Sequence, residues 1–216
     1  MLKIAVLSRG PSFAVTWRKV DPHGWGRLDA EVARIYQEVI GVNDIPTSHA
    51  VDWWVFRDYI SMEKWAPEIK SHFPQIFTGP HVMNDLVIGR HWDNAERLAT
   101  MKKQGRVIYD YELETPMEFP RGPEPNKWSS WSGIAALGFA YHRIQKYRTP
   151  HHRDPTIDCY GVDLSGTLDV FGNSNTSRDD DRWARELVTW DAMVEVIHKA
   201  GITVNRITPD DPWQTT

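Results

Sequence analysis

Short apolar runs recur along the chain, and each is bounded by glycine, proline or polar residues. The first, "KIAVLS" at 3–8, is rich in β-branched and aliphatic residues and is followed by Gly10 and Pro11. A short apolar run closed by turn residues is typical of a buried strand. The same pattern predicts about seven strands, at 3–8, 38–43, 52–58, 74–79, 106–113, 156–164 and 202–207.

Helical patterns lie between several of these runs. Residues 133–147 place apolar side chains at the spacing of one helix face: Ile134, Leu137, Ala140, Tyr141 and Ile144. Residues 93–105 combine good helix formers with a terminal glycine. Residues 179–201 begin with acids and end with basic residues, as the helix dipole favours. We therefore expect helices in these three segments.

The alternation of strands and helices predicts an α/β fold. We expect a Rossmann-like three-layer sandwich, in which helices cover both faces of a largely parallel sheet of about seven strands. The 216 residues suit a single domain, 1–216, with a polar and aperiodic lid segment at 165–182. Ligands of such folds bind beyond the carboxyl ends of the strands, so the residues that follow each strand deserve most scrutiny.

Composition narrows the partners and the compartment. The formal charge of −4, from 29 acidic and 25 basic side chains, provides no overall basic field for a nucleic acid. The single cysteine, Cys159, excludes an internal disulfide and fits a reducing compartment, so the cytoplasm is the expected location. No apolar span reaches the ~18 residues that a membrane helix needs, so we expect no membrane partner.

Two loops could bind an anion. "RGPS" at 9–12 lacks both the P-loop lysine and the three-glycine dinucleotide fingerprint, yet its backbone N–H groups and hydroxyl could face a phosphate. An ordinary turn explains the same residues. "WSSWSG" at 128–133 precedes a predicted helix, so Ser130 or Ser132 could cap that helix, and the helix N-terminus could also seat a phosphate.

The acidic run Asp179, Asp180 and Asp181 resembles a metal motif of sugar-nucleotide transferases. However, it opens a predicted helix rather than following a strand, and the helix dipole alone favours acids there, so we expect no metal site. The arginines around it, among them Arg178 and Arg182, could instead close over a phosphate.

The chain holds eleven tryptophans, and most of them are expected in the core. A smaller group lies beside the polar clusters and could stack on a ligand: Trp53, Trp54, Trp128, Trp131 and Trp183.

Taken in order, four segments resemble a known superfamily. They are "GPSF" after the first strand, "VND" at the end of the second, "SSWSGIAALGFAY" at a helix start, and "IDCYGVDL" as a later strand. This series is similar to the one-domain bacterial sialyltransferases and to the MptE-like pterin pyrophosphokinases, over about residues 3–14, 38–58 and 129–165.

The resemblance implies a Rossmann-like fold that binds a nucleotide without a metal. The residues it places near the nucleotide are Gly10, Pro11, Ser12, Asn43, Ser130, Ser132 and Gly133. The sialyltransferases carry a histidine base before the last long helix, and the corresponding stretch here has none. The carboxylates Asp58, Asp163 and Glu186 are therefore the candidate bases, with Asp58 preferred among them, and Arg178 and Arg182 could stabilise the departing phosphate.

The function expected from these residues is a metal-independent glycosyltransferase that uses a nucleotide-sugar donor and an unknown acceptor, with no further cofactor. One alternative is a diphosphate-transferring or phosphoryl-transferring enzyme of the pterin pyrophosphokinase kind, which would need Mg²⁺. Another is a protein that binds a nucleotide and catalyses nothing.

Overall fold

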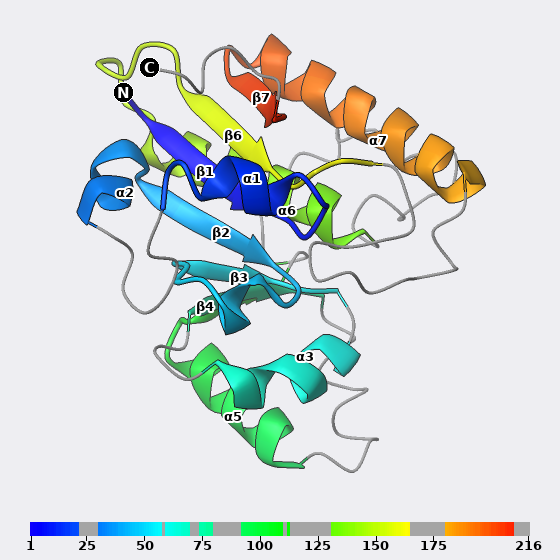
Figure 1. The fold of residues 1–216 in the computed structure, drawn as a ribbon. Helices are drawn as coiled ribbons and strands as arrows, with labels where there is room; N and C mark the ends of the chain where they lie inside the picture. Colours follow the sequence, from blue (N-terminus) through cyan, green and yellow to red (C-terminus); the bar gives the residue numbers. More distant parts are fainter. Residues whose placement is uncertain are drawn as a thin grey trace.

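The protein is described here from a computed structural model, which describes residues 1–21, 30–57, 59–69, 74–79, 92–109, 112, 131–164 and 180–209. Its centre is one sheet of seven strands, all parallel (Figure 1). The strands are β1 (Lys3–Leu7), β2 (Glu38–Val42), β3 (Trp53–Val55), β4 (Gln75–Thr78), β5 (Val107–Tyr109), β6 (Thr156–Tyr160) and β7 (Thr203–Ile207). All seven predicted strands are confirmed, each with slightly tighter bounds.

The strand order is β5-β4-β3-β2-β1-β6-β7. The chain therefore builds outward from β1 to β5, then returns and continues on the other side of β1. Residues Ile4 to Leu7 pair with Glu38 to Gly41 on one side and with Ile157 to Tyr160 on the other. The β1–β6 boundary is thus the topological switch point, where an open parallel sheet leaves a crevice at its carboxyl edge.

Helices cover both faces of the sheet. They are α1 (Phe13–Trp17), α2 (Ala30–Ile35), α3 (Tyr59–Trp65), α5 (Trp92–Lys103), α6 (Ser132–Tyr147) and α7 (Asp180–Lys199), with short 3-10 turns η1 (Ile45–Thr47) and η2 (Ala66–Glu68). The predicted helices at 93–105, 133–147 and 179–201 are confirmed as α5, α6 and α7. The architecture is the Rossmann-like three-layer sandwich that the sequence predicts.

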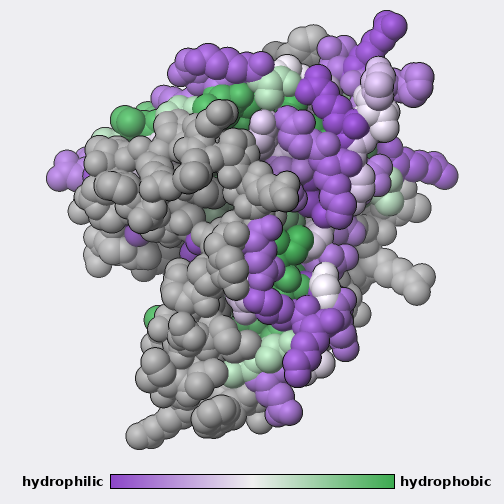
Figure 2. Space-filling model, turned by 180° about the vertical axis from the view of Figure 1, so that it is seen from behind, coloured by the Kyte–Doolittle hydropathy of each residue, from purple (hydrophilic) through white to green (hydrophobic). Residues whose placement is uncertain are grey.

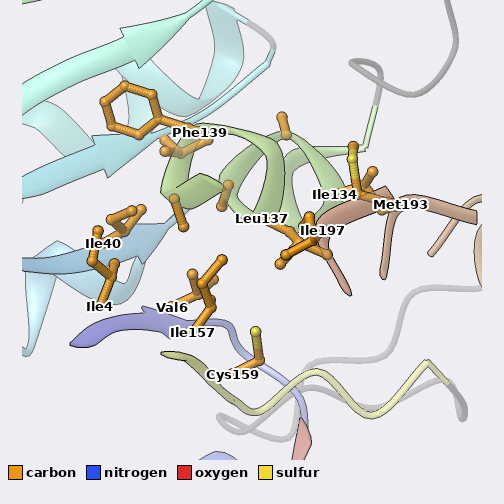
Figure 3. Close-up of a cluster of buried hydrophobic side chains, with 14 of the residues drawn as sticks. Ile4, Val6, Ile40, Ile134, Leu137, Phe139, Ile157, Cys159, Met193 and Ile197 are labelled. Atoms are coloured by element: carbon orange, nitrogen blue, oxygen red, sulfur yellow. The ribbon is translucent and has the colours of Figure 1, made fainter. Parts of the chain in front are cut away.

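The alternation of side chains along the strands divides the core between the two faces. On one face, Ile4, Val6 and Ile157 point toward α6 and α7, where they meet Leu137 and Ile197 (Figure 3). On the other face, Ala5 and Leu7 pack with Phe13 and Trp17 of α1. Further along the sheet, Trp54 and Ile76 pack against α3 and α5. Because both faces of the inner strands β1, β2, β3 and β6 are buried, these strands read as largely apolar runs, whereas the edge strand β7 is exposed or half-buried along its length.

A buried ion pair ties α6 to the amino end of β2. The Arg143 guanidinium donates to both carboxylate oxygens of Glu38, through Nε at 2.8 Å and through Nη2, and the Tyr147 hydroxyl donates to Glu38 Oε1 at 2.7 Å. The guanidinium also lies over the Trp53 ring, 4.8 Å from its centroid. Burial alone would lower the pKa of Arg143, but the hydrogen bond and charge of Glu38 outweigh it and raise this pKa. This network lies at the opposite end of α6 from the switch point.

The described surface seen from behind is mostly hydrophilic, with small hydrophobic areas between the charged side chains (Figure 2). Among the helices in the described ranges, none combines the length and the apolar character needed to cross a membrane. Cys159 is buried within β6, and burial raises the pKa of its thiol. It therefore contributes to packing as a small hydrophobic residue.

Candidate functional site

A cavity of about 400 Å³ opens at the carboxyl edge of the sheet, around the β1–β6 switch point. This volume lies within the range of small-molecule sites. Its walls come from the loops after β1, β2 and β6, the first turn of α6, and one side each of α3 and α7. The residues that line it include Arg9, Gly10, Asn43, Ile60, Lys64, Trp65, Ser132, Gly133, Asp163, Arg182, Trp183, Glu186 and Trp190.

The floor of the cavity is made where the loops after β1 and β6 meet. The Ser8 amide donates to the Tyr160 carbonyl and the Gly10 amide donates to the Gly161 carbonyl, both at 2.8 Å. A Cβ on Gly10 would lie 2.4 Å from both the Gly161 carbonyl oxygen and Asp163 Oδ2. Gly161 has a φ of +66°, and a Cβ there would meet the Ser8 carbonyl oxygen at 2.3 Å. Both glycines are therefore required by the contact of the two loops, independently of any ligand.

Asp163 holds the start of α1. Its Oδ2 accepts a 2.9 Å hydrogen bond from the Ser12 amide, and its Oδ1 accepts a very short one from the Ser12 hydroxyl. The carboxylate thus takes the position that a bound anion would occupy at this short helix. Ser12 itself is not a lining residue of the cavity, and both of its donors are directed at Asp163.

The end of β2 contributes Asn43 and, behind it, an ion pair. Asn43 is half-buried and adopts a positive φ of 53°, a conformation that asparagine tolerates better than most residues. Its carbonyl accepts a 2.6 Å hydrogen bond from the Trp54 indole, and its buried Oδ1 has no hydrogen-bond partner among the described residues. Beside it, Arg9 Nη1 lies 3.1 Å from Asp44 Oδ2. The side-chain amide of Asn43 therefore offers an acceptor that a ligand could use.

Among the described residues, no side chain caps the first turn of α6, which faces the cavity. The helix begins at Ser132, and its N-cap residue Trp131 makes no side-chain capping bond, so of the two predicted caps Ser132 is wrong and Ser130 lies outside the described residues. The first helical hydrogen bond runs from the Ala135 amide to the Trp131 carbonyl. The amides of Ser132, Gly133 and Ile134 therefore precede the helical ladder and can donate to an anion. Apart from its chain neighbours and the nearby backbone of its own helix, no described atom lies within 4 Å of a Cβ built on Gly133.

The side of α7 that borders the cavity carries a charge pair and two indoles. Arg182 Nε lies 3.7 Å from Glu186 Oε2, one turn further along the helix, and Glu186 is buried. Trp183 and Trp190 line the cavity next to this pair. In contrast, Asp180 and Asp181 are exposed in the first turn of α7. Within the described ranges, no cluster of three or more histidine, cysteine or acidic side chains could hold a metal ion.

The remaining wall comes from α3, and sequence reasoning did not find it. Ile60, Ser61, Lys64 and Trp65 line the cavity, at helical spacing along one side of α3. The helix has only seven residues, too few for a clear periodic signal. The one available signal was the polar stretch that follows β3, at the carboxyl edge of the sheet. The guanidinium of Arg9 lies over the Trp65 ring, 5.8 Å from its centroid, and the Lys64 ammonium lies 5.5 Å from it.

The fold brings most of the predicted site residues together. Those that line this one cavity are Gly10, Pro11, Asn43, Ser132, Gly133, Asp163, Arg182 and Glu186, with Ser12 directly behind Asp163. Asp58, Ser130 and Arg178 lie outside the described residues, as do residues 165–179 of the predicted lid, while residues 180–182 belong to α7.

The tryptophans selected from the sequence divide between core and cavity. Trp53 and Trp54 are buried in the sheet, whereas Trp131 and Trp183 line the cavity. Trp128 lies outside the described residues. Trp65 and Trp190 line the cavity as well, although neither is adjacent to a polar cluster in the sequence.

Comparison with known proteins adds no relative: no family model, no curated protein and no solved structure matches this chain. The chemistry of the cavity must therefore be argued from its own residues. Those residues combine helical N–H donors, arginines, indole rings and one buried carboxylate. Such a set suits a ligand that carries both a phosphate and a flat ring system.

Proposed function

We propose that this protein is a metal-independent glycosyltransferase whose cavity at the β1–β6 switch point binds a nucleotide-sugar. The observation that carries the proposal is the convergence of the uncapped first turn of α6 with Arg182 of α7 on one cavity of about 400 Å³. The amides of α6 would meet the phosphate, and the arginine would add a charge-assisted hydrogen bond. The resemblance to the one-domain sialyltransferases supports transfer of a sugar rather than another reaction of nucleotides.

Indole rings at the same cavity support a nucleotide rather than a simple phosphate. Trp131, Trp183 and Trp190 come from α7 and from the residue that precedes α6, next to the proposed phosphate position. A base can stack on an indole in any orientation that keeps the two planes parallel. The side-chain amide of Asn43 would then hydrogen-bond to the ligand on the other side of β1.

Glu186 is the carboxylate best suited to act as the base. Both oxygens of Asp163 already accept hydrogen bonds from Ser12, so we assign Asp163 to positioning the loop after β1. Glu186 is buried at the cavity, next to Arg182. In the proposed reaction it takes the proton from the acceptor hydroxyl, whose oxygen attacks the anomeric carbon. The bond from that carbon to the phosphate oxygen breaks, and the nucleotide leaves with the electron pair, stabilised by Arg182.

The test is turnover of a panel of nucleotide-sugars, with release of the free nucleotide measured in EDTA and in Mg²⁺. We expect one donor to be consumed equally in both buffers. Glu186→Gln should lower kcat by about 10²-fold to 10⁴-fold while the donor still binds. Turnover that appears only with Mg²⁺ would instead favour phosphoryl or diphosphate transfer. Stoichiometric retention of a nucleotide without turnover would indicate a binding protein.

A further inference from the structure

The cavity has two ends, and only one of them is used by the proposed nucleotide. In the sheet order, β3 and β7 lie on opposite sides of β1. α3 follows β3 and α7 leads into β7, and Figure 1 shows the two helices below and above the β1–β6 pair. Arg182 belongs to the α7 end, and the α6 amides come from a helix that packs against α7 as well as against β1 and β2. The proposed nucleotide therefore leaves the α3 end open, and a second ligand can bind there.

The α3 end carries an apolar side chain and a cation that the fold does not use. Ile60 lines the cavity with 54% of the residue exposed, although it is a large aliphatic residue. Lys64 lies one turn further along the helix, on the same side. In the protein alone, Ile60 therefore lacks a buried apolar contact. The ring of a bound ligand could supply one.

Lys64 differs from the other cations of the cavity in its ion pairing. Arg9 is paired with Asp44, and Arg182 with Glu186. Within the part of the chain that the structure describes, no carboxylate lies within ion-pair distance of Lys64, not even Glu68 four residues later. Its ammonium is near the Trp65 ring instead, at 5.5 Å from the centroid. The charge of Lys64 is thus available to a ligand at this end of the cavity.

We propose that Ile60, Lys64 and Trp65 form the acceptor subsite, and that this subsite selects a sugar with an anionic group, a phosphate or a carboxylate. The apolar C–H face of the sugar would pack against Ile60 and the indole of Trp65, and the anion would bind the Lys64 ammonium. The inference deepens the proposed function and rests on it, because the subsite is an acceptor site only if the other end holds the donor.

The experiment is calorimetric titration of the full chain with hexose 6-phosphates and hexuronic acids of glucose and galactose, with the neutral hexoses and inorganic phosphate alongside. Each titration is run with and without the nucleotide that binds best. We expect at least one anionic sugar to bind more tightly than its neutral parent, and to bind equally well when the nucleotide is present. Lys64→Gln should weaken that binding on the order of tenfold and leave the affinity for the nucleotide unchanged.

Lys103→Gln is the matched control, because it removes the same charge from an exposed lysine of α5 and should change neither affinity. Ile60→Ser should weaken binding of the anionic sugar without loss of stability, since the residue is already more than half exposed.

Equal binding of charged and neutral sugars, or no binding of either, would overturn the proposal. Competition between sugar and nucleotide, or loss of nucleotide affinity in Lys64→Gln, would also overturn it by showing that the nucleotide occupies the α3 end. In each of these cases the titration with the nucleotide alone is evaluated separately, and that titration tests the proposed function.

Discussion

The pair formed by Ser12 and Asp163 shows how one carboxylate can fix two loops at the edge of a sheet. Asp163 accepts hydrogen bonds from both the amide and the hydroxyl of Ser12, across 151 positions of sequence. The contact joins the segment after β6 to the start of α1. The role of Ser12 is therefore to orient this floor of the cavity, one step removed from the ligand.

Ser12→Ala should lower the free energy of unfolding by about 1–2 kcal/mol, because it removes one hydrogen bond to a partly buried carboxylate. The amide of residue 12 still donates to Asp163, so the loop should keep its position. Urea denaturation measures the loss, and calorimetry should show nucleotide affinity within about threefold of wild type. A large loss of affinity with no loss of stability would mean that the hydroxyl contacts the nucleotide directly.

The buried pair Glu38–Arg143 gives a larger effect on stability. Glu38→Ala leaves the Arg143 guanidinium without its carboxylate in an environment where only 5% of the residue is exposed. We expect a loss of about 3–5 kcal/mol, measured by urea denaturation. The double variant Glu38→Leu/Arg143→Met should recover most of it, because the uncompensated charge is then gone. A double variant as unstable as Glu38→Ala would contradict this explanation.

Two histidines should make stability depend on pH. Burial lowers the pKa of His49 and outweighs the opposing charge of Asp21, with a smaller contribution from Arg18, and burial together with Arg143 and Lys146 lowers that of His142, both from an ordinary value of 6.5. The unfolded chain then binds more protons than the folded one below pH 6.5, so stability is complete above that pH and declines as the pH falls toward the folded pKa.

This dependence is measured by urea denaturation at pH 5 to 8. His49→Gln should flatten the decline, whereas His151→Gln, at an exposed position, should retain it. A decline of equal size in His49→Gln and wild type would show that other groups cause it.

At the scale of elements, substitutions of Gly133 and Gly10 should separate an effect on nucleotide affinity from an effect on stability. Outside its chain neighbours and the nearby backbone of α6, no described atom lies within 4 Å of a Cβ on Gly133, whereas one on Gly10 would collide with Gly161 and Asp163. Gly133→Leu should therefore fold with nearly wild-type stability but lose nucleotide affinity by more than tenfold, because its side chain fills the phosphate position. Gly10→Ala should instead destabilise the protein. Thermal unfolding and calorimetry on both variants check this, and full affinity in Gly133→Leu would rule out a phosphate at this turn.

The short elements are also those that the sequence pattern did not reveal. α1, α2 and α3 have five, six and seven residues, so their apolar positions cannot repeat often enough to establish a helical period. The longer α6 was predicted because its apolar face recurs over several turns, and α7 because acids open it and basic residues close it. As a consequence, the wall made by Lys64 and Trp65 was missed.

For the whole molecule, the fold was predictable because the inner strands β1, β2, β3 and β6 are buried on both faces and therefore read as largely apolar runs. The position of the cavity followed from one topological rule, since polar residues after parallel strands meet at the carboxyl edge. The pairing of Ser12 with Asp163 was not predictable, because it depends on β6 lying beside β1 after four other strands have been placed. For the same reason the sequence could not distinguish Asp163 as a positioning residue from Glu186 as a candidate base.

The central claim is that nucleotide phosphate is bound at the α7 end of this cavity by helical amides and Arg182. The most direct measurement is calorimetric titration of the best nucleotide in EDTA, for wild type, Arg182→Ala and Arg185→Ala. Arg185 lies on the same helix but is exposed and does not line the cavity, so it matches the charge change. We predict that wild type and Arg185→Ala bind alike without metal, and that Arg182→Ala binds about 10-fold to 100-fold more weakly. Binding that EDTA abolishes, or that Arg182→Ala and Arg185→Ala affect equally, would contradict the account.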